Sequence, residues 1–210
     1  MNVLGKLILV FFIFGFVPGI SPAQEEEGEF SVFNWKMAVL KKNVAAYESV
    51  PFRQPLSMTR RDMYQLYLGF ESSCLCYVIQ ENDEGRLPLI YKKAVSSGDK
   101  IILPGEGGDF KAAENPGTSR FYIVVSARPK QNLERLINQY IEQQGKEPAP
   151  AALERSILSE ALAIRRSVSS RPEPPEKTAP AAGTDPSIKG DFWLFESRDD
   201  WVVTVTVRVQ

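Results

Sequence analysis

The fold is decided by the stretch Cys74-Leu75-Cys76-Tyr77-Val78-Ile79-Gln80, which continues through Glu81-Asn82-Asp83-Glu84-Gly85 into Arg86-Leu87-Pro88-Leu89-Ile90-Tyr91. Two runs rich in β-branched and aromatic residues are joined by a short polar segment that ends in glycine, and this order predicts a β-hairpin. Successive side chains of a strand point to opposite faces. In the first strand the predicted faces are Leu75, Tyr77 and Ile79 on one side and Cys74, Cys76 and Val78 on the other.

Further strand-like runs lie on both sides of this hairpin. Met63 to Phe70 alternates between two faces, and Lys100 to Leu103 is a short strand. Gly105 to Gly117 is a loop with a short strand around Phe110, and Ser119 to Ser126 is the most β-branched and aromatic run, which indicates a buried strand. The set of Met63 to Phe70 that we expect to face the core is Tyr64, Leu66, Leu68 and Phe70.

The run from Phe30 to Leu40 fits two patterns. Alternating apolar residues around Trp35 and Met37 are typical of a half-buried strand, whereas Met37, Leu40 and Val44 also fall on one helical stripe. We favour a strand to about Val39, which ends in the polar residues that follow.

After Pro129 the apolar residues adopt the spacing of a helix. Two amphipathic helices are therefore predicted, and each should bury one face. We expect them to cover the open side of the sheet, although pairing with another subunit would use the same stripes. The stripes are Leu133, Leu136, Ile137, Tyr140 and Ile141, with Gly145 at the helix C-terminus, and then Leu153, Ile157, Ala161, Ile164 and Val168.

The C-terminal part predicts a linker and a final strand pair. Residues 170–190 are rich in proline and poor in large apolar groups, which predicts a flexible linker. Residues 191–210 predict a β-hairpin, whose last strand is too apolar to stay unpaired and must join the chain's own sheet or a partner's. The residues that we take as a candidate partner edge are Trp201, Val203, Val205 and Val207.

The N-terminus predicts a signal peptide. Lys6 precedes the apolar run Leu7 to Val17, and Ser21-Pro22-Ala23 offers small residues where a signal peptidase reads them. The run is too short to span a bilayer, so we expect cleavage after Ala23 and no stable membrane span afterwards. The predicted location is periplasmic or secreted.

These elements divide the chain into a signal peptide (residues 1–23), a β-rich core domain with a closing helix (24–145), a second helix (146–169), the linker (170–190) and the hairpin (191–210). The predicted fold class is mainly β within α+β: an antiparallel β-sandwich or a partly open barrel, with two amphipathic helices towards the C-terminal side.

The composition narrows the classes of function. The chain has 25 Lys plus Arg against 26 Asp plus Glu, a net charge of −1, two cysteines and no histidine. A nearly neutral balance gives no electrostatic footprint for nucleic acid or an anionic bilayer. The lack of histidine removes Ser-His-Asp and Cys-His nucleophiles and histidine-based zinc sites. We therefore expect no enzyme activity, no cofactor and no metal site.

Cys74 and Cys76 could be free thiols or could form a disulfide. They are two residues apart in an extended strand, where disulfide geometry is hard to reach, so we favour free, buried thiols. A strained or intermolecular disulfide is the alternative in an exported protein. The acidic turn at Asp83 and Glu84 lacks the ligand spacing of a calcium loop, and Gly105 to Asp109 lacks the partners of a phosphate loop.

Several of these motifs resemble the domain of unknown function 4384 family, over roughly residues 56–144. The family's members are bacterial and often exported, and the resemblance implies no activity. Lys92 departs from the family's pattern, in which a proline is usual. The motifs of the central hairpin are Cys74 to Gln80, Asp83, Gly85 and Leu89-Ile90-Tyr91. The motifs of the closing strand and following helix are Phe110-Lys111-Ala112, Gly117-Thr118, Phe121 to Ser126 and Leu133-Glu134-Arg135-Leu136.

Three functions fit the sequence. The first is an exported, non-enzymatic module that binds a protein or cell-envelope partner, through a sheet edge or an aromatic face. The second is an assembly component whose C-terminal hairpin completes a neighbouring sheet, which leaves the oligomeric state open. The third, which we favour least, is a hydrolase that works without histidine through two carboxylates.

Overall fold

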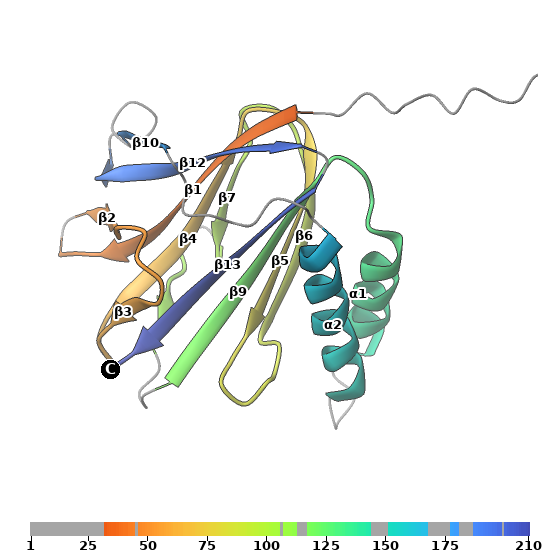
Figure 1. Cartoon of the computed structure of the whole chain (residues 1–210). Coiled ribbons are helices and arrows are strands. Elements are labelled where there is room, and N and C mark those ends of the chain that lie inside the picture. The colour runs from red at the N-terminus through yellow and green to blue at the C-terminus, as the bar shows by residue number, and fades with distance from the viewer. Residues whose placement is uncertain are drawn as a thin grey trace, which may run out of the picture.

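The computed structural model describes residues 32–44, 46–105, 107–112, 117–143, 151–167, 177–180, 187–198 and 200–210. This part of the chain is mainly strand, arranged in two facing sheets with two helices on one side (Figure 1). The predicted signal peptide and the cleavage after Ala23 lie outside the described residues.

In chain order the elements are β1 (Val32–Lys42), β2 (Tyr47–Ser49), β3 (Leu56–Met58), β4 (Met63–Phe70), β5 (Cys74–Glu81), β6 (Leu89–Val95), β7 (Lys100–Leu103), β8 (Phe110–Lys111), β9 (Gly117–Ser126), α1 (Gln131–Gln143), α2 (Ala151–Ser167), β10 (Lys177–Pro180), β11 (Ile188–Lys189), β12 (Asp191–Arg198) and β13 (Asp200–Val209). No helix in the described ranges is both long enough and apolar enough to cross a bilayer.

The first sheet is built around β1. On one flank β1 pairs with β12 and then with β2, and on the other flank it pairs with β4. The outer flank of β4 pairs with β7 and β8, while β10 and β11 extend the far side of the sheet. From Val32, where the described part begins, the run to Leu40 is therefore a strand, as we favoured, and the strand continues to Lys42.

The second sheet has the order β3-β13-β9-β5-β6. The predicted hairpin is confirmed as β5 and β6, joined by a turn in which Gly85 has a φ of 73°. A positive φ is a conformation that glycine adopts without steric cost. β9 pairs with β5 on one flank and with β13 on the other, all antiparallel, whereas β3 runs parallel to β13.

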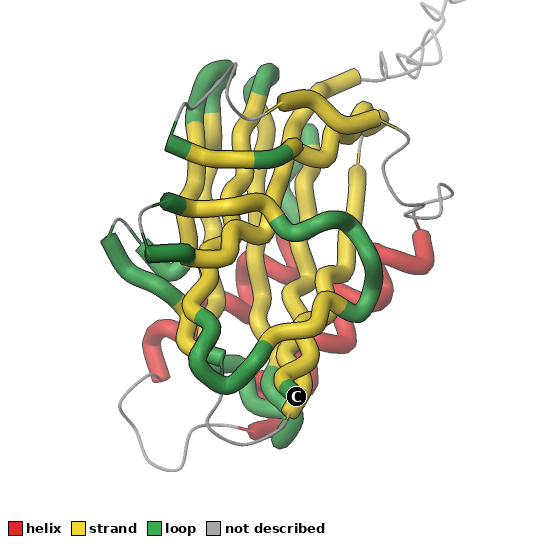
Figure 2. Tube along the Cα trace, turned by 90° about the vertical axis from the view of Figure 1, so that its left-hand side faces the viewer, coloured by secondary structure: helices red, strands yellow, loops and turns green. Residues whose placement is uncertain are grey.

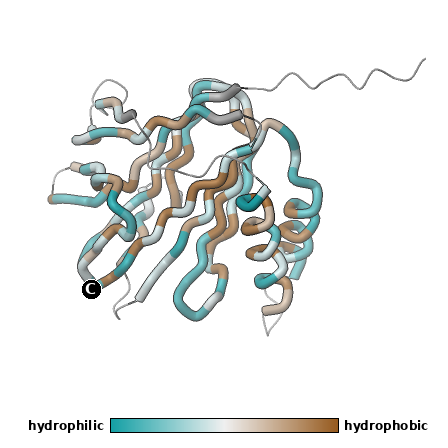
Figure 3. The backbone as a smooth tube through the Cα atoms, viewed as in Figure 1, coloured by the Kyte–Doolittle hydropathy of each residue, from teal (hydrophilic) through white to brown (hydrophobic). Residues whose placement is uncertain are grey.

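The core lies between the two sheets and matches the predicted strand faces. Tyr64, Leu66, Leu68 and Phe70 all belong to it, together with Cys74, Cys76 and Val78. The opposite face of β4 is buried as well, because Tyr67 stacks on Phe192 with ring centroids 4.7 Å apart. Figure 3 shows hydrophobic residues concentrated along the central strands.

The helices cover the outer face of the second sheet, as we expected. The buried residues of α1 and α2 pack on Tyr77, Ile79, Tyr122, Val124 and Val202 in one cluster. α1 and α2 lie side by side on this face (Figure 1). The buried members of the stripes need no second subunit to cover them, but the side chain of Ile141 is 50% exposed, so its predicted burial is wrong. Gly145 and Val168, which we placed at the helix ends, lie outside the described residues.

The predicted C-terminal β-hairpin is wrong. β12 and β13 follow each other with only one residue between them, yet β12 pairs with β1 in the first sheet and β13 with β9 in the second. β12 begins with the continuous apolar run Phe192 to Phe195, whereas β13 alternates. The partner strands β1 (11 residues) and β9 (10 residues) come from different sheets. The two strands therefore complete the sandwich rather than forming a separate unit.

The predicted flexible linker is also wrong where it is described. β10, from Lys177 to Pro180, pairs with β12, and β11 pairs in parallel with β2. A strand at a sheet edge is held by its backbone hydrogen bonds, which need no large apolar side chains. Ile188 adds a buried side chain beside Leu40. Residues 170–176 and 181–186 lie outside the described ranges.

Candidate functional site: an open flank of β13

The edge strands of the two sheets expose backbone donors and acceptors, which can pair with another chain unless the edge is protected. The outer flank of β6 pairs with no described strand. Lys92 and Lys93 stand in the middle of β6 and are exposed. Lys93 forms an ion pair with Asp99 at 3.7 Å, and Lys92 donates to Asn138 at 3.0 Å. Lysines on an edge strand oppose strand addition, so this edge is protected.

The outer strands of the first sheet are protected by their shortness. β8 and β11 have two residues each, and β7 and β10 have four. β10 also ends in Pro180, which has no N–H to offer to a new strand. Short edge strands present too few hydrogen-bonding groups to template a partner.

β13 differs from these edge strands because a neighbouring strand covers one of its flanks fully and the other only in part. It pairs with β9 along its whole length, from Asp200 to Val209, but β3 covers the other flank only from Val207 to Val209. In Figure 1, β9 runs beside all of β13, while β3 lies only near its end. We call the uncovered stretch, from Trp201 to Val205 on the side away from β9, the open flank. It carries no charged residue.

The hydrogen bonds show where the second neighbour of β13 stops. Gln210 N donates to the backbone oxygen of Met58 at 2.9 Å, as expected beside a strand. Thr206 N, on the same flank, donates instead to the side-chain oxygen of Gln54 at 2.8 Å. Alternate residues of a strand point their amides the same way. The amides of Val202 and Thr204 therefore also face this flank, where the described residues supply no acceptor.

The inward residues of the open flank are Val203 and Val205, which are fully buried, and Trp201, which is aromatic. Trp201 is only partly buried, and its ring lies 6.4 Å from that of Phe195 on β12. Phe52, in the loop between β2 and β3, meets Trp193 edge-on at 4.4 Å and is also partly buried. Figure 2 views the molecule from the side on which β2, β3 and β10 lie.

Two polar groups near the open flank have no partner within the described residues. The indole nitrogen of Trp201 and the hydroxyl of Thr204 are both buried and make no hydrogen bond. Trp201 faces the space between the sheets, whereas Thr204 belongs to the opposite face of the strand. Buried donors without acceptors are rare and call for an explanation.

The start of β13 is firmly held. The hydroxyl of Ser126 donates to Asp200 at 2.6 Å, and Lys130 forms an ion pair with the same carboxylate. Ser126 is fully buried, and Arg128 N donates to its oxygen at 3.1 Å. This corner ties β9, β13 and the start of α1 together, so the open flank is fixed in place before anything binds to it.

The predicted partner-edge residues need a correction. The side chains of Val203, Val205 and Val207 lie in the core between the sheets, and that of Trp201 packs against it. Val207 pairs on both flanks. The part of β13 that lacks a second neighbouring strand is the backbone of its first half, from Trp201 to Val205. Gln54 was not predicted to contribute, because nothing local in the sequence links it to a strand about 150 residues away.

Cys74 and Cys76 are free and buried in the core. Burial raises the pKa of Cys74 to about 11, and burial together with the neighbouring Cys74 raises the pKa of Cys76 further. A high pKa keeps a thiol protonated, and the protonated form is a poor nucleophile. Of the two alternatives for these residues, the described structure contains the free thiols.

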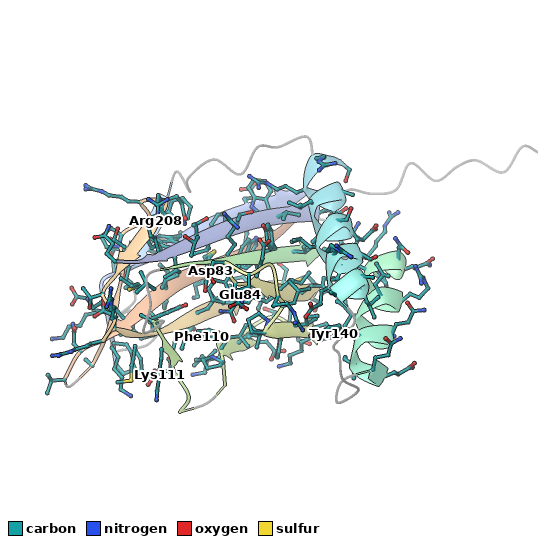
Figure 4. The ribbon with its side chains drawn as sticks, turned by 90° about the horizontal axis from the view of Figure 1, so that it is seen from below. Asp83, Glu84, Phe110, Lys111, Tyr140 and Arg208 are labelled. Atoms are coloured by element: carbon teal, nitrogen blue, oxygen red, sulfur yellow. The ribbon has the colours of Figure 1, made fainter. Side chains whose placement is uncertain are left out.

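The buried carboxylate of Glu154 holds the β5–β6 turn against α2. It accepts hydrogen bonds from Arg86 Nε at 2.7 Å, Tyr140 Oη at 3.1 Å and the backbone N of Leu87 at 3.4 Å. Figure 4 shows Tyr140 on α1 and, in the turn, Asp83 and Glu84. Among the described residues, no group of three potential ligands is placed to hold a metal ion.

Asp109 fixes the glycine-rich loop in a similar way. Its carboxylate accepts hydrogen bonds from Lys42 Nζ at 2.6 Å and Tyr47 Oη at 2.7 Å. Burial acts to raise the pKa of Asp109, but the hydrogen bonds from Lys42 and Tyr47 outweigh it and hold the pKa below its ordinary value. Gln65 completes the cluster by donating to Gly108 O at 2.8 Å.

Comparisons with protein-family models, with curated proteins and with solved structures find no match for this chain. The resemblance to the domain of unknown function 4384 family therefore stays a prediction from short motifs.

Proposed function

We propose that this protein is an exported, non-enzymatic binding module that takes up an extended segment of a partner protein at the open flank of β13. The observation that carries the proposal is the incomplete hydrogen bonding on this flank of β13. β3 pairs only with Val207 to Val209, Gln54 accepts from the amide of Thr206, and the amides of Val202 and Thr204 face no described acceptor.

The physical basis is strand addition. An extended peptide that pairs with an open edge gains main-chain hydrogen bonds, and alternate side chains of the peptide give selectivity. The open flank is about as long as an ordinary strand, which is five or six residues. Lysines protect β6, and shortness protects β7, β8, β10 and β11. The flank of β12 that β10 does not reach carries the charged residues Glu196 and Arg198, whereas the open flank of β13 carries none.

The assembly role is less well supported. For residues 191–210 to complete a neighbour's sheet, β12 and β13 would have to leave the sheets in which they now pair with β1 and β9. A hydrolase that works without histidine has weaker support still. The buried carboxylate of Glu154 is occupied by three donors, and the pKa of Asp109 is lowered, whereas a general acid needs a raised one.

Titration with a synthetic peptide tests the proposal. The probe is a peptide of about seven residues in which valine and threonine alternate, with a lysine added at each end for solubility. We expect it to bind the full chain, and we expect Thr204→Pro to abolish binding, because proline removes an amide that faces the open flank and fills the space beside it.

The matched control leaves the protein unchanged and alters the probe. N-methylation of those peptide amides that face β13 should abolish binding, whereas N-methylation of the alternate amides should not. Binding that survives both the protein variant and the methylated probe would place the peptide elsewhere and refute the proposal.

A further inference from the structure

The inward side chains of the open flank are covered although no described strand lies beside them. Val203 is 2% exposed and Val205 is 0% exposed, while β3 reaches only Val207 and the two residues after it. A side chain at the edge of the core would be exposed to water if nothing lay beside it. Other atoms therefore already fill the space beside these two valines, at the close packing of a protein core. A strand that binds at the open flank finds little space for inward side chains.

The hydrogen-bonding positions of β13 make this size limit strict. The amides of Val202 and Thr204 face the open flank, whereas that of Val203 faces β9. In an antiparallel pair, residues that exchange hydrogen bonds have Cα atoms about 5.5 Å apart, and the residue pairs between them are closer, at about 4.5 Å. An added antiparallel strand would form the closer pairs with Val203 and Val205. The side chains that approach most closely are therefore the inward ones.

The outward positions are less restricted. The side chain of Thr204 points outward and remains partly exposed, and the pairs formed at its position are the wider ones. Val202 also points outward and is 2% exposed, because it belongs to the cluster that the two helices cover. A bound strand can therefore carry a larger side chain beside Thr204 than beside the inward valines.

A second copy of the chain does not meet the size limit. If two open flanks paired through the amides of Val202 and Thr204, the inward residues of one copy would lie opposite the inward residues of the other. The inward residues are Trp201, Val203 and Val205. A valine or a tryptophan of one copy would then have to fit beside the valines of the other. The occupant that fits is another polypeptide, with smaller inward side chains.

We propose that the open flank accepts an antiparallel segment of a partner protein that has glycine or alanine at the inward positions beside Val203 and Val205. The alternating outward positions of the segment carry larger residues, such as threonine. This inference rests on the proposed function and specifies its ligand by side-chain size. Because the limit acts on every second residue, the open flank selects an alternating sequence of small and larger residues.

The test compares three alternating probes. Each has threonine at the outward positions, a lysine at each end, and alanine, valine or phenylalanine at the inward positions. N-methyl groups on the inward residues leave only the threonine amides free to pair with β13, so the variable side chains must point inward. Titration of each probe into the full chain gives its Kd. We expect the alanine probe to bind most tightly and the phenylalanine probe at least about tenfold more weakly, with the valine probe between them.

A protein variant makes room at one inward position. Val203→Ala removes methyl groups that lie beside the bound strand, so the valine probe should gain affinity relative to the alanine probe. The control is Val207→Ala, at a position that is also inward and 1% exposed but is paired on both flanks. In the control, the ratio of the two Kd values should stay as it is in the parent. Because each ratio is taken within one variant, a loss of stability affects both Kd values equally.

The outcomes separate this inference from the function on which it rests. If the three probes bind equally well and Thr204→Pro abolishes their binding, strand addition stands and the size limit is refuted. If no probe binds at concentrations up to about 1 mM, both are refuted. If the parent dimerises in sedimentation and Thr204→Pro prevents it, the occupant is a second copy and the size limit is wrong. The comparison of the three probes on the parent decides alone if Val203→Ala does not fold.

Discussion

At the scale of single residues, buried polar groups in this protein act as anchors between distant parts of the chain. Glu154 is 2% exposed and joins α2 to the turn between β5 and β6. Ser126 and Asp200 join two strands at the corner of the second sheet. Hydrogen bonds satisfy each of these groups, and a group that loses its partner while buried destabilises the fold.

The first prediction concerns Glu154. Glu154→Ala leaves the amide of Leu87 and the guanidinium of Arg86 without their acceptor, so we expect the free energy of unfolding to fall by about 2–3 kcal/mol in urea denaturation. The control is Glu160→Ala on the same helix, where the carboxylate makes an exposed contact with Asn132 and the change should stay within about 0.5 kcal/mol. Equal effects of the two substitutions would contradict the anchoring role.

The second prediction concerns the thiols. A pKa of about 11 for Cys74, against an ordinary value of 9.0, lowers its thiolate fraction about a hundredfold at neutral pH. We expect both cysteines to react slowly with a thiol reagent in the native protein and quickly in denaturant, with two thiols titrated per chain. Fewer than two thiols after denaturation without reductant would indicate a disulfide.

The third prediction concerns pH. The pKa of Asp109 is lower in the folded state than in the unfolded chain, so its carboxylate stabilises the fold above the ordinary value of 3.8 and loses this effect as pH falls through the folded value. Asp109→Asn should therefore be less stable than the parent at pH 7, and the difference should be smaller at a pH below the folded pKa of Asp109. A difference that is the same at both pH values would exclude the ionised carboxylate as its cause.

At the scale of elements, edge strands decide what the molecule can pair with. β6 is as long as many interior strands, and Lys92 and Lys93 are what distinguish it from the open flank of β13. The fourth prediction follows: a Lys92→Thr and Lys93→Thr double variant should self-associate with rising concentration, as measured by sedimentation. A double variant that remains monomeric would show that the lysines do not guard this edge.

The two flanks of β13 give the fifth prediction. The amide of Val203 faces β9, whereas that of Thr204 faces the open flank. Val203→Pro breaks the ladder inside the sheet and should cost about 2–3 kcal/mol more than Thr204→Pro in thermal or urea unfolding. Equal costs would mean that both flanks are paired and that the open flank does not exist.

At the scale of the whole molecule, the sequence predicts the faces of single strands and helices but not which strands pair with each other. The faces of β4 and β5 and the stripes of α1 and α2 were predictable, because an alternation or a helical period is written in neighbouring residues. The assignment of β12 and β13 to different sheets was not, because an apolar or alternating run indicates a strand but does not specify which strand it pairs with. The contact between Gln54 and Thr206 has no local signal at all.

The central claim is that the first half of β13 has one flank ready to accept a strand. Amide hydrogen exchange, followed by NMR on the full chain with and without the alternating valine–threonine peptide, tests it most directly. We expect exchange at Val202 and Thr204 to slow at least about tenfold with the probe, and exchange at Val203 and Val205 to stay as it is, since these amides already pair with β9. Protection at other sites, with Val202 and Thr204 unchanged, would contradict the claim.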